Sequence, residues 1–217
     1  MTRLTTVLYV LALSLLGLQA ASIDGHAQSS SSDVERELGT TGHLKIENPG
    51  ELTPGEANQV YDGIADELAE FYALSREPAA VNFRKWRRYN NAPYLSATHG
   101  NRYVNNYGNR LSAGYDRMTS GFRMPAGAIL VKNSFTVTED GEVFGAAMFI
   151  MEKLSVGRSP RTGDWRYVMV MPDGSYEGDS EGDNAEQVAY CHDCHAAVAR
   201  HDFLFYIPKS YRRAAGN

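Results

Sequence analysis

The stretch that decides the fold is a predicted β-hairpin at residues 128–154, AILVKNSFTVTEDGEVFGAAMFIMEKL. Two runs rich in β-branched and aromatic residues flank the turn EDG at 139–141, a typical hairpin connection. Alternation along the first run places Leu130, Lys132 and Ser134 on one face of the strand. The pattern therefore predicts an antiparallel sheet in which Lys132 can point inward.

Other elements are predicted on both sides of this hairpin. Apolar residues recur at helical spacing from Val60 to Tyr72, and Thr53 is a suitable cap for such a helix. Further predictions are a turn that leads into a short strand within 97–105, a polar helix at 110–118, a strand at 165–171 and a helix from 183 or 184 to about 199. Residues 78–94 give no clear signal. The predicted fold class is α+β, a mainly antiparallel sheet with flanking helices.

The C-terminal helix of this prediction carries the motif CHDCH at residues 191–195. The motif contains both cysteines of the chain and two of its six histidines. The spacing Cys-x-x-Cys-His is typical of c-type haem attachment. Cys191 and Cys194 would form thioethers to the porphyrin vinyl groups, and His195 would ligate the iron. The motif therefore predicts one covalently bound haem c.

Two other interpretations of the cysteine pair are weaker. A structural zinc site needs four ligands, whereas only Cys191, Cys194 and either His192 or His201 are near in sequence. A thioredoxin-like redox pair would follow a strand of a βαβ unit, but the upstream residues indicate antiparallel hairpins.

The motif lies near the end of the chain, and this position bears on the second axial ligand. No methionine follows His195, and the last one is Met171. Met148, Met151 or Met169 could still approach the iron, although methionine on strands more often fills the core. The better expectation is a five-coordinate iron with one open face, which suits binding or chemistry of a small molecule.

The N-terminal sequence predicts export to the periplasm. Arg3 precedes an apolar run at 7–18 that is short for a membrane span, so residues 1–27 are predicted as a signal peptide. Residues 28–55, rich in Ser and then in Gly, Pro and Thr, are predicted as a flexible arm, and residues 56–217 as the haem domain. The alternative is an uncleaved anchor in the inner membrane. Export agrees with haem c, which is assembled outside the cytoplasm.

The charge pattern excludes nucleic acid as the expected partner. The formal net charge is −5, and the one basic run, RKWRR at 84–88, is short. Such a run is more typical of a solvated surface than of a phosphate-binding patch.

Several motifs together resemble the cytochrome P-460 family, which includes the gas-binding c′-β cytochromes. They cover most of residues 97–212 and comprise HGNRYVN at 99–105, PAGAILVK at 125–132, GDWRY at 163–167, PDG at 172–174, CHDCH at 191–195, FLF at 203–205 and SYR at 210–212. The resemblance implies an antiparallel sheet with flanking helices, a homodimer and a five-coordinate haem c.

The resemblance also implies roles for particular residues. Lys132 stands where hydroxylamine-oxidising members join a lysine covalently to the porphyrin, and Glu186 matches a carboxylate that relays protons beside the open iron face. Arg102 and His99 could supply polar contacts in the same pocket. Ordinary structural roles remain the alternative for all four residues, such as a solvent-facing strand lysine or a glutamate in the first turn of a helix.

The leading functional expectation is a periplasmic haem oxidoreductase that converts hydroxylamine to nitrous oxide or disposes of nitric oxide. Its electrons would pass to a redox partner protein such as another cytochrome. The alternative is a non-catalytic binder of nitric oxide or carbon monoxide, in which Phe144 or Phe149 crowds the open face. A plain electron carrier is the third expectation.

Overall fold

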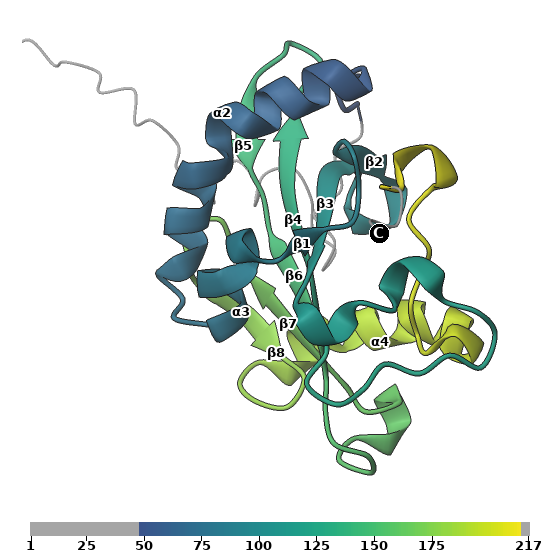
Figure 1. Cartoon of the computed structure of the whole chain (residues 1–217). Helices are drawn as coiled ribbons and strands as arrows, with labels where there is room; N and C mark the ends of the chain where they lie inside the picture. The colour runs from purple at the N-terminus through teal and green to yellow at the C-terminus, as the bar shows by residue number, and fades with distance from the viewer. Residues whose placement is uncertain (1–47, 214–217) are drawn as a thin grey trace, which may run out of the picture.

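A computed structural model describes residues 48–213 of the chain. The predicted signal peptide (1–27) and most of the predicted arm (28–55) lie outside these residues. The described part contains one eight-stranded antiparallel sheet with helices on both of its faces (Figure 1), which confirms the predicted fold class. Within residues 48–213, no helix is long and apolar enough to cross a membrane.

The sheet has the strand order β1-β3-β4-β6-β7-β8, with β2 paired to β3 and β5 paired to β4. The strands are β1 (Arg87–Arg88), β2 (Tyr94–Ser96), β3 (Arg102–Gly108), β4 (Ile129–Val137), β5 (Val143–Gly145), β6 (Met148–Lys153), β7 (Trp165–Val170) and β8 (Tyr176–Asp179). The α-helices are α2 (Pro54–Ala73), α3 (Pro78–Asn82) and α4 (Ala189–His195). The 3-10 turns are η1 (Phe83–Lys85), η2 (Ala97–His99), η3 (Arg110–Ser112), η4 (Tyr115–Arg117), η5 (Pro160–Thr162), η6 (Ala185–Val188), η7 (Ala196–His201) and η8 (Lys209–Tyr211).

The predicted hairpin forms the centre of the sheet, but its returning arm is divided into β5 and β6. Phe135 of β4 lies opposite Gly145, whereas Lys132 lies opposite Phe149. The returning arm therefore contains one more residue than β4 between these two pairs. This extra residue is a β-bulge, which bends a strand and re-aims its side chains.

Helix α2 begins where the capping signal predicts. The hydroxyl of Thr53 accepts from the backbone N–H of Glu56, and the Glu56 carboxylate accepts from the backbone N–H of Thr53. This reciprocal pair satisfies two donors that the first turn of a helix leaves open. Pro54 stands in the first turn, where its missing N–H costs nothing.

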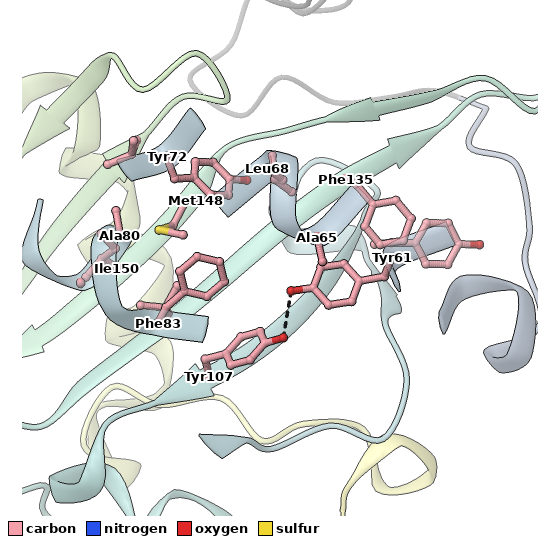
Figure 2. Packing of buried hydrophobic residues seen from close by; sticks show 14 of the residues in the cluster. Tyr61, Ala65, Leu68, Tyr72, Ala80, Phe83, Tyr107, Phe135, Met148 and Ile150 are labelled. Atoms are coloured by element: carbon pink, nitrogen blue, oxygen red, sulfur yellow. Dashed lines mark hydrogen bonds between the residues drawn. The ribbon is translucent and has the colours of Figure 1, made fainter. Parts of the chain in front are cut away.

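Alternation along the strands gives the sheet two different faces. The helix face packs on α2 and α3 through a cluster of large side chains that includes Tyr61, Tyr107 and Phe135 (Figure 2). The cavity face lies toward α4 and the C-terminal segment, and its cluster includes Leu130 and Tyr167.

Other predicted elements differ from the structure. The expected helix at 110–118 consists of the single turns η3 and η4, separated by Gly114, where a β-carbon would lie 2.4 Å from the ring of Phe122. The expected helix at 183–199 is an interrupted run of η6, α4 and η7, although the whole CHDCH motif is in α4. The edge strand β8 was not predicted.

Candidate functional site

The main cavity lies between the cavity face of the sheet, α4 and the C-terminal segment. Its empty space measures about 710 Å³, including the part that opens to solvent. Its lining includes the following side chains: His99, Asn106, Tyr115, Leu130, Lys132, Phe149, Met151, Tyr167, Cys191, Cys194, His195, Leu204 and Phe205.

Helix α4 brings the cysteine pair to one wall of this cavity. Cys191 and Cys194 are three residues apart, so both lie on the same side of the helix, and both are free thiols. Cys191 is half-buried and Cys194 is exposed. Burial raises the pKa of the Cys191 thiol to about 12, so this thiol keeps its hydrogen at neutral pH.

The imidazole of His195 is buried and held in one orientation. Its Nδ1 lies 2.6 Å from the carbonyl oxygen of Phe203. A carbonyl only accepts hydrogen bonds, so Nδ1 carries the hydrogen and Nε2 is the ring nitrogen that lacks one. The ring packs between Tyr167 and Phe205, with centroid distances of 5.6 and 5.2 Å. This arrangement suits an imidazole that binds a metal through Nε2.

Lys132 projects into the cavity, as alternation along β4 predicts. Its neighbours on the adjacent strands are Asn106 of β3 and Phe149 of β6, and all three line the cavity. Burial lowers the pKa of the Lys132 amine to about 8, because removal from water disfavours the charged form. Most of this amine is therefore still charged at neutral pH, and a minor fraction is neutral.

His99 forms a polar pair with Lys132. Nζ of Lys132 lies 3.4 Å from Nε2 of His99, and Nδ1 of His99 lies 2.9 Å from the hydroxyl oxygen of Ser96. The rings of His99 and Phe149 pack edge to face, with their centroids 4.9 Å apart. Lys132 and His99 therefore place an amine and an imidazole beside an aromatic wall.

Two further polar groups of the cavity have different surroundings. The side chain of Asn106 accepts from the hydroxyl of Tyr94 and donates to that of Tyr115, which itself donates to the Phe205 carbonyl. The buried hydroxyl of Tyr167 has no hydrogen-bond partner among residues 48–213. A buried polar group without a partner is uncommon, and in a cavity it indicates a place for a ligand.

Arg102 and Glu186 lie around the cavity rather than in its lining, and only one of the two candidate phenylalanines lines it. Arg102 is buried and donates to the backbone carbonyl of His99 at 3.4 Å, so it supports that residue from behind. Glu186 is exposed in η6, and it is not among the residues that line the cavity. Phe149 lines the cavity, whereas Phe144 borders a surface groove beside α2.

The three candidate methionines are separated by the sheet. Met148 is fully buried in the cluster on the helix face, which places it away from the cavity. The Met169 sulfur accepts from the Tyr190 hydroxyl at 3.4 Å. Of the three methionines, Met151 is the one that lines the cavity.

The residues present fit a haem of the c type. One cavity combines a mainly apolar wall, two thiols one helical turn apart and an imidazole whose Nδ1 is bound by a backbone carbonyl. In the described part of the chain, no three His, Cys, Asp or Glu side chains are grouped to hold a metal ion by themselves. This finding leaves the zinc interpretation without support there.

Sequence reasoning did not single out Tyr167, Asn106 and Tyr115 as site residues. Tyr167 carries a weak signal, because it alternates with Trp165 on a strand next to the hairpin. The register of β3 against β4 places Asn106 at the cavity, and the turn η4 places Tyr115 there. Neither residue lies in a distinctive local sequence pattern.

Comparison with known proteins gave one match. The family model described as cytochrome P-460 matches residues 81–206, which is more than half of the chain. No curated protein matches the chain significantly.

Proposed function

The chain belongs to the cytochrome P-460 family and is a haem cytochrome, and we propose that it is an oxidoreductase that converts hydroxylamine to nitrous oxide. The observation that carries this proposal is the convergence of Cys191, Cys194, His195 and Lys132 on one cavity. Conversion of nitric oxide at the same site belongs to this proposal.

The cofactor in this proposal is one haem c. Cys191 and Cys194 would each form a thioether to a vinyl carbon, with the thiol hydrogen passing to the neighbouring carbon, so attachment needs no oxidant. His195 would ligate the iron through Nε2, because Nδ1 is engaged by the Phe203 carbonyl. When bound, the haem supplies a redox-active iron with a coordination position for a small nitrogenous ligand.

Side chains of the cavity would accept the protons that the reaction releases. Two hydroxylamine molecules that form one nitrous oxide and one water release four protons and four electrons. A proton acceptor must lie within hydrogen-bond reach of the substrate. Lys132, partly neutral because burial lowers its pKa to about 8, and His99 at 3.4 Å from it are two groups that can accept and pass on a proton. Ser96 hydrogen-bonds the far side of the imidazole.

Glu186 remains a predicted relay. Its exposed position in η6 would connect it with solvent, whereas Lys132 and His99 lie at the cavity itself. The geometry therefore favours the Lys132–His99 pair as the first acceptor. A bond between Lys132 and the porphyrin, which the family resemblance implies, is the alternative to a free amine that accepts protons. An optical spectrum that Lys132→Met leaves unchanged would exclude this bond.

A second candidate function is reversible binding of nitric oxide or carbon monoxide. Phe149 favours it, because its ring lies in the cavity against His99 and can restrict access to the iron. In a plain electron carrier, the third candidate, Met151 would have to occupy the second axial position.

The proposal also concerns the surroundings of the protein. Haem c attachment supports export to the periplasm, and four electrons per turnover require a redox partner protein such as another cytochrome. We also propose that the protein forms a homodimer and does not bind nucleic acid.

The test uses purified holoprotein, its optical spectrum, its intact mass and hydroxylamine-dependent reduction of a dye. We expect dye reduction that falls at least tenfold in Lys132→Met and changes less in Glu186→Gln. Absence of dye reduction, together with ready carbon monoxide uptake by the ferrous protein, would support the gas-binding alternative. A ligand-resistant spectrum that becomes ligand-accessible in Met151→Leu would support the electron carrier.

A further inference from the structure

The segment after η7 reverses direction through two residues in the left-handed region. Asp202 has a φ of 58° and Phe203 has a φ of 62°. Residues other than glycine rarely adopt this conformation, and a phenylalanine seldom does. Such a turn persists where the surrounding structure over-determines it, and it is often found at functional sites. Here the reversal brings the Phe203 carbonyl back onto Nδ1 of His195.

The carboxylate of Asp202 ties this turn to two other segments. It is 1% exposed and accepts from the Lys153 ammonium at 2.6 Å and from the backbone N–H of Met124 at 2.7 Å. The backbone carbonyl of Asp202 accepts from the indole N–H of Trp165 at 2.8 Å. Three parts of the chain thus hold the residue that precedes Phe203.

Lys153 is itself held rigidly at the end of β6. Its backbone N–H donates to Ala128, and its carbonyl accepts from Gly127. The ammonium also donates to the Gly163 carbonyl at 2.8 Å and lies 4.9 Å from the centroid of the Trp165 ring. A buried ion pair of this kind is costly to desolvate, and apolar side chains of similar volume could fill the space as well. The Lys153–Asp202 ion pair connects the end of β6 to the Asp202–Phe203 turn, and this connection gives the pair a role beyond filling space.

The ring of Phe203 packs closely against the backbone of Gly163. A β-carbon on Gly163 would lie 2.2 Å from a ring atom of Phe203, and Gly163 itself has a φ of +63°. The ring therefore packs directly on a glycine backbone, while its carbonyl engages His195. Both ends of Phe203 are fixed by neighbours that the Lys153–Asp202 pair connects.

We propose that Asp202 and Lys153 are positioning residues for His195, and that their buried ion pair holds the Phe203 carbonyl on the imidazole and so sets the reduction potential of the haem. The inference rests on the proposed role of His195 as the iron ligand. A carbonyl that accepts from Nδ1 makes the imidazole a stronger donor at Nε2, which stabilises ferric iron. Loss of the ion pair lets the turn relax, weakens that hydrogen bond and raises the potential.

The test compares the holoprotein with Asp202→Asn and with the double variant Lys153→Met/Asp202→Asn. Asparagine tolerates the left-handed backbone, and the double variant leaves no buried unpaired charge, so it keeps the test open if Asp202→Asn does not fold. We expect a higher midpoint potential and a lower iron–histidine stretching frequency in both. A tenfold change in the ratio of oxidised to reduced protein corresponds to about 59 mV for one electron.

The matched control is Glu77→Gln. Glu77 is also a buried carboxylate, 5% exposed, and accepts from Arg166 at 3.1 Å in a separate ion-pair cluster. This variant is expected to lose thermal stability without a change of potential. If Asp202→Asn and the double variant keep the potential and stretching frequency of the wild type, as Glu77→Gln does, the ion pair is only structural and the inference is wrong.

The two proposals fail in different ways. A His195→Ala holoprotein with an unchanged spectrum would show that His195 is not the iron ligand, which would overturn the proposed haem ligation and this inference together. An altered spectrum in His195→Ala, with an unchanged potential in the Asp202 variants, would overturn the inference alone.

Discussion

The two faces of the sheet use the same strands for different purposes. On β4, Val131 and Phe135 point into the cluster under α2, whereas Leu130 and Lys132 point into the cavity. The helix face is filled by large side chains, whereas the cavity face borders about 710 Å³ of empty space that is partly open to solvent. Alternation on one strand therefore separates the part of the sequence that stabilises the fold from the part that forms the site.

Polar groups differ between the two faces in the same way. On the helix face, the Tyr61 hydroxyl lies 2.8 Å from that of Tyr107 (Figure 2). It also accepts from the Asn133 side chain at 3.1 Å. On the cavity face, Tyr167 keeps a hydroxyl that has no partner in residues 48–213, and Lys132 keeps a desolvated amine. The helix face also keeps a buried atom without a partner in these residues, Asn133 Oδ1, but only Tyr167 and Lys132 line a space that a ligand can occupy.

The largest effect is expected from a large-to-small substitution on the helix face. Phe135 is fully buried, so Phe135→Ala should lower the free energy of unfolding by about 3–5 kcal/mol. Chemical denaturation of the holoprotein measures this loss. The optical spectrum of the folded variant should match the wild type, because the side chain faces away from the cavity. A changed spectrum with little loss of stability would contradict the separation of the two faces.

A pH-dependent effect is expected on the cavity face. Burial lowers the pKa of Lys132 from 10.5 to about 8, so the unfolded chain binds more protons between these two values. The contribution of Lys132 to the unfolding free energy therefore rises with pH from about 8 to 10.5. Lys132→Met should remove this rise, as measured by denaturation across that pH range. The control is Lys85→Met, at an exposed lysine of η1, and it is expected to keep the wild-type dependence of the unfolding free energy on pH. If the wild type and Lys132→Met show the same pH dependence, the amine of Lys132 is not buried.

The smallest effect is expected from one hydroxyl on the helix face. Tyr107→Phe removes the partner of Tyr61 but leaves the bond from Asn133, so the loss should be about 0.5–1.5 kcal/mol. Thermal unfolding at fixed pH measures it, and neither the spectrum nor the potential should move. A loss as large as that of Phe135→Ala would show that the hydroxyl pair, rather than apolar packing, dominates this face.

Much of this contrast could be predicted from the sequence, because it follows from short-range patterns. Alternation placed Lys132 on the cavity side, the cap residue Thr53 marked the start of α2, and the spacing of Cys191 and Cys194 marked the wall of the site. Each of these signals lies within a few residues and has a direct geometric meaning.

The features that sequence did not predict depend on contacts between distant segments. Strand β8 has the sequence YEGD, without apolar alternation, and Arg166 of β7 binds the carboxylate of Asp179 at 2.8 Å. The bulge between β5 and β6 follows from register, and the turn at Asp202 is stabilised by Lys153 from another strand. Glu186 was predicted from its distance to the motif in sequence, which does not determine where its side chain lies.

The central claim is that the cavity holds one haem, attached through α4. Intact mass of the exported wild-type protein, beside that of Cys191→Ala/Cys194→Ala, tests it most directly. The account predicts that the wild type exceeds its polypeptide mass by one haem after denaturation, and that the double variant has the polypeptide mass alone. A wild type without the added mass, or a double variant that retains it, would contradict the account.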